Sequence, residues 1–480
     1  MPDCARPRVG VFGWGVVAPK SPNICAFEKN LASSETWLMP FNGFGPDNFL
    51  AGTPDFCFED YKGWINKRFA PRHFQNLKEK MWFPSLYAIG GFIQALEQNP
   101  GMEAELKALG TRAHVYIGTG LGNLGTISDA TLVLHEAQAR WDAFWKDRET
   151  DLGEYLRELS EIDSVEIEGE IEAGKLNTIR EKEKRRTRLQ EKWNSPEPPW
   201  RVTANVIWNL HNTPAAQVSI LGHLTGLAFA PVAACSTFGV CLKVAMNAIR
   251  SGDAKAVVVG ATDGPPHPLV VGAFYSARVL AADGHVSIPL TKLQGTHVAG
   301  GSVIWIVGDL DYFQSKGFKP LGMELVGVGV TSDAHHIITP STQGPKEAIL
   351  EALADASVAP EEIGSWDLHA TATPGDYGEV ATLRSILPDS VLVTARKGTF
   401  GHGMSAGGGW ELTAQYLGYQ RGTLFPTPLA EHDLNRTIAT VHDRYVYDSP
   451  AAVPEGLAGK LSMGIGGINA CVISRPLDRE

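Results

Sequence analysis

Short apolar segments with β-type residues recur along this chain, and segments with a helical pattern separate them. They occupy residues 9–12, 114–117, 256–260, 302–307, 321–330 and 390–394. Many are apolar at every position, which is typical of strands covered on both faces. Strands that alternate with helices in this way predict parallel strands joined by crossover helices, and therefore an α/β fold.

Composition and charge exclude several classes of protein. The 480 residues are 44% apolar and carry a net charge of -11, which argues against a disordered chain and against a general nucleic-acid binder. Because no apolar run reaches the roughly 18 residues of a membrane-spanning helix, we expect no membrane span. The cysteines are scattered without a CxxC pair, so neither a zinc site nor a disulfide framework is indicated. The first residues resemble no signal peptide, and we expect a cytoplasmic protein.

Residues 136–199 differ from the rest of the chain, since they are charged and poor in glycine. Their acidic part, residues 149–172, precedes a basic part, residues 175–192, and Gly174 lies near the change of sign. The composition favours helix. We predict a helical insertion, a hairpin that turns near Gly174 and whose arms attract each other. Both a solvated surface excursion and a partner-docking element remain open.

One cysteine precedes a helix that is apolar on nearly every face. Cys235 stands just before residues 240–250, and Gly252 suits the C-terminal cap of that helix. Unpaired N–H groups and the helix dipole favour a thiolate, so we predict a lowered thiol pKa. A buried cysteine taken alone is more often a core residue.

Two histidines follow predicted strands. His369 comes after residues 365–367, and His402 follows the strand at 391–394 in a segment rich in glycine and threonine. Parallel sheets bind ligands at the carboxyl ends of their strands. A cysteine with histidines is what acyl transfer through a thioester requires.

At this point the chain resembles the elongating β-ketoacyl-ACP synthases of the thiolase superfamily, types I and II. Cys235 stands in the nucleophile motif, and His369-Ala-Thr371-Ala-Thr373-Pro matches the motif H-G/A-T-x-T. Lys397 and His402 match K-x-x-x-x-H. Residues 462–469 resemble the glycine-rich loop near the family's C-terminus. The resemblance covers nearly the whole chain except residues 136–199.

The resemblance implies a role for each matching residue. Cys235 would accept an acyl chain from acyl carrier protein, and His369 and His402 would hold the thioester carbonyl of malonyl-ACP during decarboxylation. Backbone N–H groups of Cys235 and Ile465 would form the oxyanion hole. Lys397, paired with Glu379, would support the histidine loop. The expected substrate-binding residues are Thr371 and Thr373 on the phosphopantetheine arm, with Phe274, Phe238 and Phe400 around the acyl group.

The family fold implies two similar halves, each with a five-stranded mixed sheet, stacked in αβαβα layers. The halves would be residues 1–310, with the insertion, and residues 311–480. The family resemblance also implies a homodimer, or a heterodimer with a related chain. No metal and no cofactor of its own are expected, since acyl carrier protein brings the phosphopantetheine. The basic arm 180–192 is a candidate docking surface for that acidic protein.

The sequence departs from the family pattern in four places. Ile465 stands where an aromatic gate is usual, and residues 295–302 lack the usual acidic residue. The loop after Pro374 is one residue shorter, and the insertion has no counterpart. These departures suggest a specialised synthase, for a polyketide or an unusual fatty acid.

Other interpretations remain open. A thiolase would need a second cysteine in the loop 464–467, which has none. A chain-length-factor-like partner subunit would lack the nucleophile, and a malonyl-ACP decarboxylase would keep the histidines alone. Residues 118–125 resemble a dinucleotide loop, and His335 with His336 are weak metal-ligand candidates.

Overall fold

The computed structural model describes residues 6–44, 48–146, 152–167, 172–193 and 203–477. The chain divides into two compact units. The main unit comprises Met1–Asn123 and Trp208–Glu480, and the second comprises Leu124–Ile207. The second unit begins earlier and ends later than the predicted insertion, residues 136–199. Each unit is described by itself.

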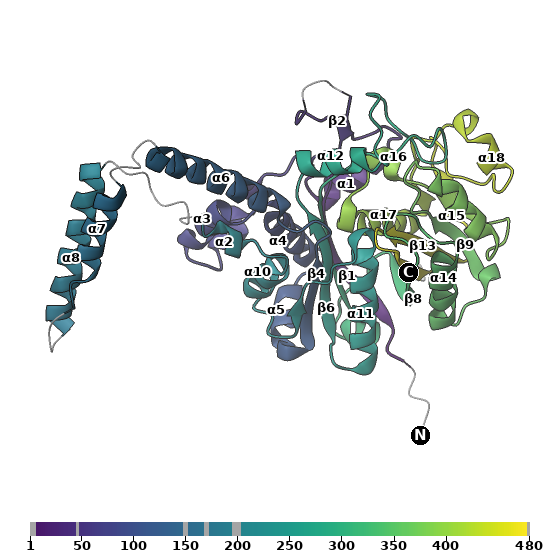
Figure 1. Ribbon diagram of the computed structural model, residues 1–480. Helices are drawn as coiled ribbons and strands as arrows, with labels where there is room; N and C mark the ends of the chain where they lie inside the picture. The colour runs from purple at the N-terminus through teal and green to yellow at the C-terminus, as the bar shows by residue number, and fades with distance from the viewer. Residues whose placement is uncertain (1–5, 45–47, 147–151, 168–171, 194–202, 478–480) are drawn as a thin grey trace. The chain divides into compact units, whose positions relative to one another are not determined.

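A ten-stranded mixed sheet forms the main unit, in the order β10-β9-β13-β14-β8-β1-β7-β6-β4-β5 (Figure 1). The strands of the first half are β1 (Val9–Val17), β4 (Ala113–Gly118), β5 (Ala228–Phe229), β6 (Ala256–Asp263) and β7 (Gly301–Asp309). Those of the second half are β8 (Met323–Ser332), β9 (Ile363–Asp367), β10 (Leu392–Thr394), β13 (Leu457–Gly464) and β14 (Ile468–Pro476). All six predicted strands are present.

The two halves repeat one strand order. Reading from the centre, β1-β7-β6-β4-β5 corresponds to β8-β14-β13-β9-β10, five strands each. The halves join where β1 pairs with β8, at Val9 with Leu325 and Gly10 with Glu324. Only β4, β5 and β6, and likewise β9, β10 and β13, pair in parallel, so the sheet is mixed and not wholly parallel.

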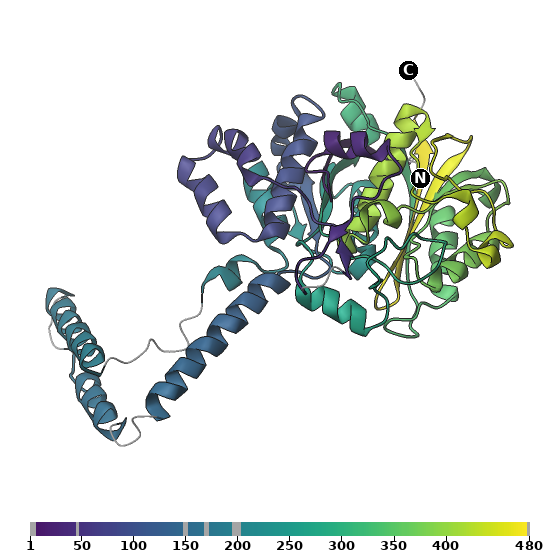
Figure 2. The ribbon, with the colours of Figure 1, turned by 90° about the horizontal axis from the view of Figure 1, so that it is seen from above.

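Helices form three layers around this sheet (Figure 2). The central helices α11 (Thr237–Ser251) and α17 (Met404–Arg421) contact each other and lie between the halves. On the outer faces, α4 (Phe83–Glu97) and α10 (Thr213–Gly222) cover the first half, and α14 (Gln343–Ala356) with α15 (Gly375–Arg384) covers the second. This is the expected αβαβα arrangement.

Outside residues 124–193, the other described α-helices are short or peripheral. They are α1 (Ile24–Leu31), α2 (Lys62–Asn66), α3 (Pro71–Lys80), α5 (Met102–Ala108), α9 (Asn205–Trp208), α12 (Pro268–Ser276), α13 (Leu310–Ser315), α16 (Lys397–Phe400) and α18 (Arg436–Ala439). Two-residue strands also pair as β2 (Met39–Pro40) with β3 (Leu50–Ala51), and as β11 (Thr423–Leu424) with β12 (Ala451–Ala452).

The second unit is helical, with α6 (Leu124–Lys146), α7 (Leu152–Asp163) and α8 (Glu172–Trp193). Helices α7 and α8 form the predicted hairpin around a small core of Tyr155, Ile162, Leu189 and Trp193. Ion pairs join the arms, Arg186 to Asp163 and Lys192 to Glu158, each at 2.5 Å. The turn predicted near Gly174 is wrong, because Gly174 lies inside α8. Parts of the predicted insertion (147–151, 168–171 and 194–199) lie outside the described residues.

Candidate active site

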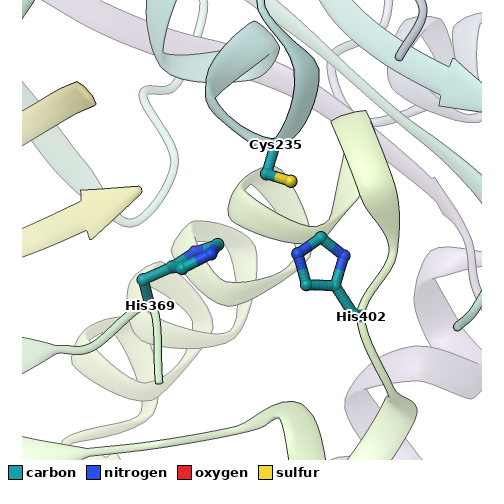
Figure 3. A group of neighbouring side chains, drawn as sticks. All are labelled: Cys235, His369 and His402. Atoms are coloured by element: carbon teal, nitrogen blue, oxygen red, sulfur yellow. The ribbon is translucent and has the colours of Figure 1, made fainter. Parts of the chain in front are cut away.

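One cysteine and two histidines lie together at the carboxyl ends of the parallel strands. Each belongs to a loop or turn that follows such a strand directly or after a short helix. Cys235 lies in a single 3₁₀ turn, Ala234–Ser236, directly before α11. His369 follows β9, and His402 follows α16. Ligand atoms of the three side chains lie within 4.8 Å of one another, and all three residues are buried (Figure 3). The sequence therefore predicted correctly which residues would meet.

A strained turn holds the cysteine. Ala234 has a φ of 47°, a left-handed conformation that costs a non-glycine residue about 1–2 kcal/mol. Thr237 stabilises the turn, since its Oγ1 accepts from Ala233 N at 3.0 Å and donates to Ala234 O at 2.7 Å. Ser236 Oγ lies 2.7 Å from the carbonyl oxygen of Ile468. These contacts fix the direction of the Cys235 side chain relative to both halves.

The predicted lowering of the thiol pKa is wrong. Burial raises the pKa of Cys235 to about 11, because desolvation of the thiolate outweighs the hydrogen bonds and charges that favour it. Those opposing influences are, in order, the N–H of Ile465, the charge of Lys397 and the N–H of Cys235 itself. The two N–H groups named for the oxyanion hole thus both act on the sulfur. The resting nucleophile is a thiol.

The two histidines are held neutral. Burial first, and then the charge of Lys397, lowers the pKa of His369 far below its ordinary value and that of His402 to about 3. His402 Nδ1 accepts from Met404 N at 3.1 Å, and His369 Nδ1 lies 3.4 Å from the ammonium of Lys397. Because each Nδ1 faces a donor, these contacts assign the ring proton to Nε2.

The expected pair between Lys397 and Glu379 is wrong. Lys397 Nζ donates to Glu411 Oε1 at 2.7 Å and also to the carbonyl oxygen of His369. Glu379 instead accepts from the backbone N–H groups of His369, at 2.6 Å, and Ala370, at 2.8 Å. Burial raises the pKa of Glu379 to about 7. Glu379 therefore supports the histidine loop through its backbone and not through the lysine.

The predicted substrate-binding residues lie in different surroundings. Thr371 and Thr373 are partly exposed, and their hydroxyl oxygens lie 2.9 Å apart. Phe274 lies half-buried on α12. Phe238 and Phe400 belong to the core, where their rings lie 5.2 Å from Trp305 and 5.8 Å from Trp37 respectively. Their roles toward a substrate stay predictions.

Sequence reasoning missed Asp263, a fully buried carboxylate at the end of β6. It accepts from the N–H groups of Gly120 at 3.1 Å, Leu121 at 2.8 Å and Ser405 at 2.9 Å. It thereby ties the loop after β4 to the first turn of α17, two residues after His402. Two N–H groups of the dinucleotide-like loop, those of Gly120 and Leu121, are thus already used by a carboxylate. The sequence feature that could have indicated this residue is an aspartate at the end of an otherwise mostly apolar strand.

A second buried cluster lies behind the histidines. Asp367 accepts from Arg396 Nε at 2.8 Å, and Lys460 Nζ lies 2.8 Å from Glu411 Oε2. With Lys397, three cations face the two carboxylates of Asp367 and Glu411. Cysteine and histidine are zinc ligands in general, but the ammonium of Lys397 lies 3.4 Å from His369 Nδ1 and disfavours a metal ion on that nitrogen. His336, one of the metal-ligand candidates, uses its Nδ1 to accept hydrogen bonds from the N–H groups of Ile338 and Thr339.

Comparison with known proteins places this fold in one class, the ketosynthases with a thiolase-like fold. Residues 173–310 match the beta-ketoacyl synthase N-terminal domain, and residues 323–430 match the C-terminal domain. The chain belongs to the β-ketoacyl synthase family of the thiolase superfamily. It is 25% identical to the 3-oxoacyl-acyl-carrier-protein synthase I, chloroplastic, of Hordeum vulgare, over 98% of this chain and 89% of that protein.

Solved structures share the fold. The ishigamide ketosynthase/chain length factor is 18% identical with a TM-score of 0.74, covering 99% of this chain and 100% of that one. A type II PKS acyl-carrier protein in complex with its ketosynthase gives a chain that is 17% identical, with a TM-score of 0.68 over 98% of this chain and 100% of that one. No described helix is both long and apolar enough to cross a membrane.

Proposed function

We propose that this chain is an active β-ketoacyl-ACP synthase, which joins a malonyl unit to an acyl chain carried on Cys235. The observation that carries the proposal is the buried group of Cys235, His369 and His402, whose ligand atoms lie within 4.8 Å of one another. A partner subunit without activity would need neither the thiol nor two neutral histidines beside it.

The first half-reaction transfers the acyl chain. Cys235 Sγ attacks the thioester carbonyl carbon of acyl-ACP, the proton of the thiol passes to the phosphopantetheine sulfur, and that sulfur leaves as a thiol. Because the thiol pKa is about 11, proton removal must accompany the attack. The N–H groups of Cys235 and Ile465 stabilise the negative charge of the tetrahedral intermediate.

The second half-reaction makes the carbon–carbon bond. Nε2–H of His369 and His402 donates to the thioester carbonyl oxygen of malonyl-ACP. The electron pair of the breaking carbon–carboxylate bond then becomes an enolate as carbon dioxide leaves. The enolate carbon attacks the acyl carbonyl on Cys235, and the sulfur leaves and regains a proton. Neutral donors placed in advance stabilise the enolate without reorganisation.

We propose acyl carrier protein as the partner, and a dimer as the working form. The edge strand β5 pairs on one side only, and Leu227 and Val232 beside it are more than half exposed, at 57% and 55%. A second copy or a related chain would cover these residues.

The choice between fatty-acid and polyketide synthesis depends on the acyl chain that is accepted.

Intact-mass measurement after incubation with a panel of acyl-ACPs tests the proposal. We expect one acyl adduct on the native chain and none on Cys235→Ala. A native chain that forms no adduct with any acyl group, yet decarboxylates malonyl-ACP, would be a decarboxylase. A chain with neither activity would be a partner subunit.

A further inference from the structure

Lys460 is a lysine inside a strand that is buried on both faces. It lies on β13, its side chain is 1% exposed, and it pairs in register with Asp367 on β9. Its ammonium donates to Leu368 O at 3.1 Å and Leu461 O at 2.5 Å, besides the ion pair with Glu411. Burial so far from water carries a large desolvation cost for this charge. The motifs that identify the active site do not include it.

The contacts of Lys460 complete a set of four around the His369 segment. Lys460 binds the carbonyl oxygen of Leu368, and Lys397 binds that of His369. On the other side, the two oxygens of Glu379 accept from the N–H groups of His369 and Ala370. Consecutive backbone groups are therefore held by two ammoniums and one carboxylate. Both ammoniums share one counter-ion, Glu411.

The charge of Lys460 also reaches Glu379. Burial is the largest influence on the pKa of Glu379 and raises it to about 7, and Lys460 is the strongest influence that lowers it. Asp376, also on α15, acts in the opposite direction. A neutral carboxyl group has one oxygen that carries a proton, so it accepts less well from two N–H groups at once.

We propose that Lys460 is a positioning residue for the condensing reaction. It holds the His369 segment directly through the Leu368 carbonyl and indirectly through the charge that it supplies to Glu379. This inference rests on the proposed function, in which His369 binds the malonyl thioester. When Lys460 is replaced, Glu379 gains its proton at higher pH, the grip on the His369 and Ala370 N–H groups weakens, and His369 loses its alignment.

Two readouts against pH, from about 6 to 9, test the proposal. The first is hydrogen exchange of the peptide that contains residues 368–370, corrected for the intrinsic pH dependence of exchange. The second is decarboxylation of malonyl-ACP. In the native chain, we expect protection and rate to rise together with a midpoint near the Glu379 pKa of about 7. In Lys460→Met, both midpoints should move up by one pH unit or more.

A matched control is Lys243→Met, since Lys243 also donates to a carbonyl oxygen, that of Val328, beside a carboxylate, Asp355. Its midpoints should equal those of the native chain. If Lys460→Met does not fold, Glu379→Gln decides the question, because an amide does not titrate and the rise near pH 7 should disappear.

Three outcomes overturn the proposal. They are an unchanged midpoint in Lys460→Met, a uniform loss at every pH, and a rise near pH 7 that persists in Glu379→Gln. Failure of the proposed function has a different signature, since the native chain would then show the exchange midpoint but would form no acyl adduct on Cys235.

Discussion

Glu411→Gln removes the one carboxylate that two buried ammoniums share. Lys397 Nζ lies 2.7 Å and Lys460 Nζ 2.8 Å from its two oxygens, and its side chain is completely buried. At an effective dielectric constant of about 20, each pair attracts by roughly 6 kcal/mol before desolvation is subtracted. Breaking one buried ion pair costs about 3–5 kcal/mol net. Because both cations lose their nearer carboxylate and only Lys460 keeps another, Asp367 at 3.9 Å, we expect a destabilisation of about 4–5 kcal/mol.

Urea denaturation at fixed protein concentration, followed by circular dichroism, measures this loss. Glutamine keeps the volume and one acceptor of glutamate, so no cavity contributes. Glu59→Gln is a matched control, since Glu59 also pairs with two lysines, Lys62 at 3.5 Å and Lys78 at 2.6 Å, but at the surface. The control should unfold at the native urea concentration.

A second variant separates charge from packing. Lys460→Met in the Glu411→Gln background removes one of the two cations that have lost Glu411. Part of the lost stability should therefore return. If Glu411→Gln unfolds together with Glu59→Gln, the network contributes no net stability and the reasoning is refuted. The reasoning is also refuted if adding Lys460→Met destabilises Glu411→Gln by as much as Lys460→Met destabilises the native chain.

Three further predictions concern other parts of the chain. With a thiol pKa of about 11, alkylation of Cys235 by iodoacetamide should quicken about tenfold per pH unit from pH 7 to 10, whereas a plateau near pH 8 would contradict the burial argument. Gly301→Ala should abolish soluble expression, because φ is 148° and an added Cβ would lie 2.1 Å from Val17 O; a native melting temperature would refute this. Trp193→Ala should expose the hairpin of α7 and α8 to protease, with no change in the unfolding midpoint of the main unit, since Trp193 belongs to the small core of the hairpin; unchanged cleavage would count against that core.

Local patterns indicated which three side chains would lie together, and the family resemblance implied their roles. Cys235 precedes an apolar helix, and each histidine follows a strand, so position along the chain already indicates a common edge of the sheet. The αβαβα layers followed from the family resemblance and not from the alternation of strands. That alternation predicted only parallel pairing, whereas the outer pairs of each half are parallel and the inner ones antiparallel.

The partners of these groups could not be predicted, because they depend on tertiary burial. Glu411 lies in an otherwise apolar stretch of α17, and nothing in its neighbours indicates that it, and not Glu379, faces Lys397. The helix-dipole argument for Cys235 was sound locally, but it omitted the desolvation that dominates once the whole fold surrounds the sulfur. The prediction of a turn near Gly174 was wrong for a different reason. One glycine was given too much weight, although the residues around it strongly favour helix.

In the proposed function, one set of buried charges serves two half-reactions that both create negative charge. In the resting state the thiol is protonated and both rings are neutral, so no anion exists at the site. Both proposed half-reactions create negative charge, the first on the tetrahedral oxygen and the second on the enolate. Three cations, Lys397, Lys460 and Arg396, are already in place for that charge, and Glu411 and Asp367 hold them. Because these dipoles and charges are fixed by the fold, the reaction itself need not reorganise them. Burying three cations lowers the stability of the fold, and the same cations would stabilise the negative charge of the proposed transition states.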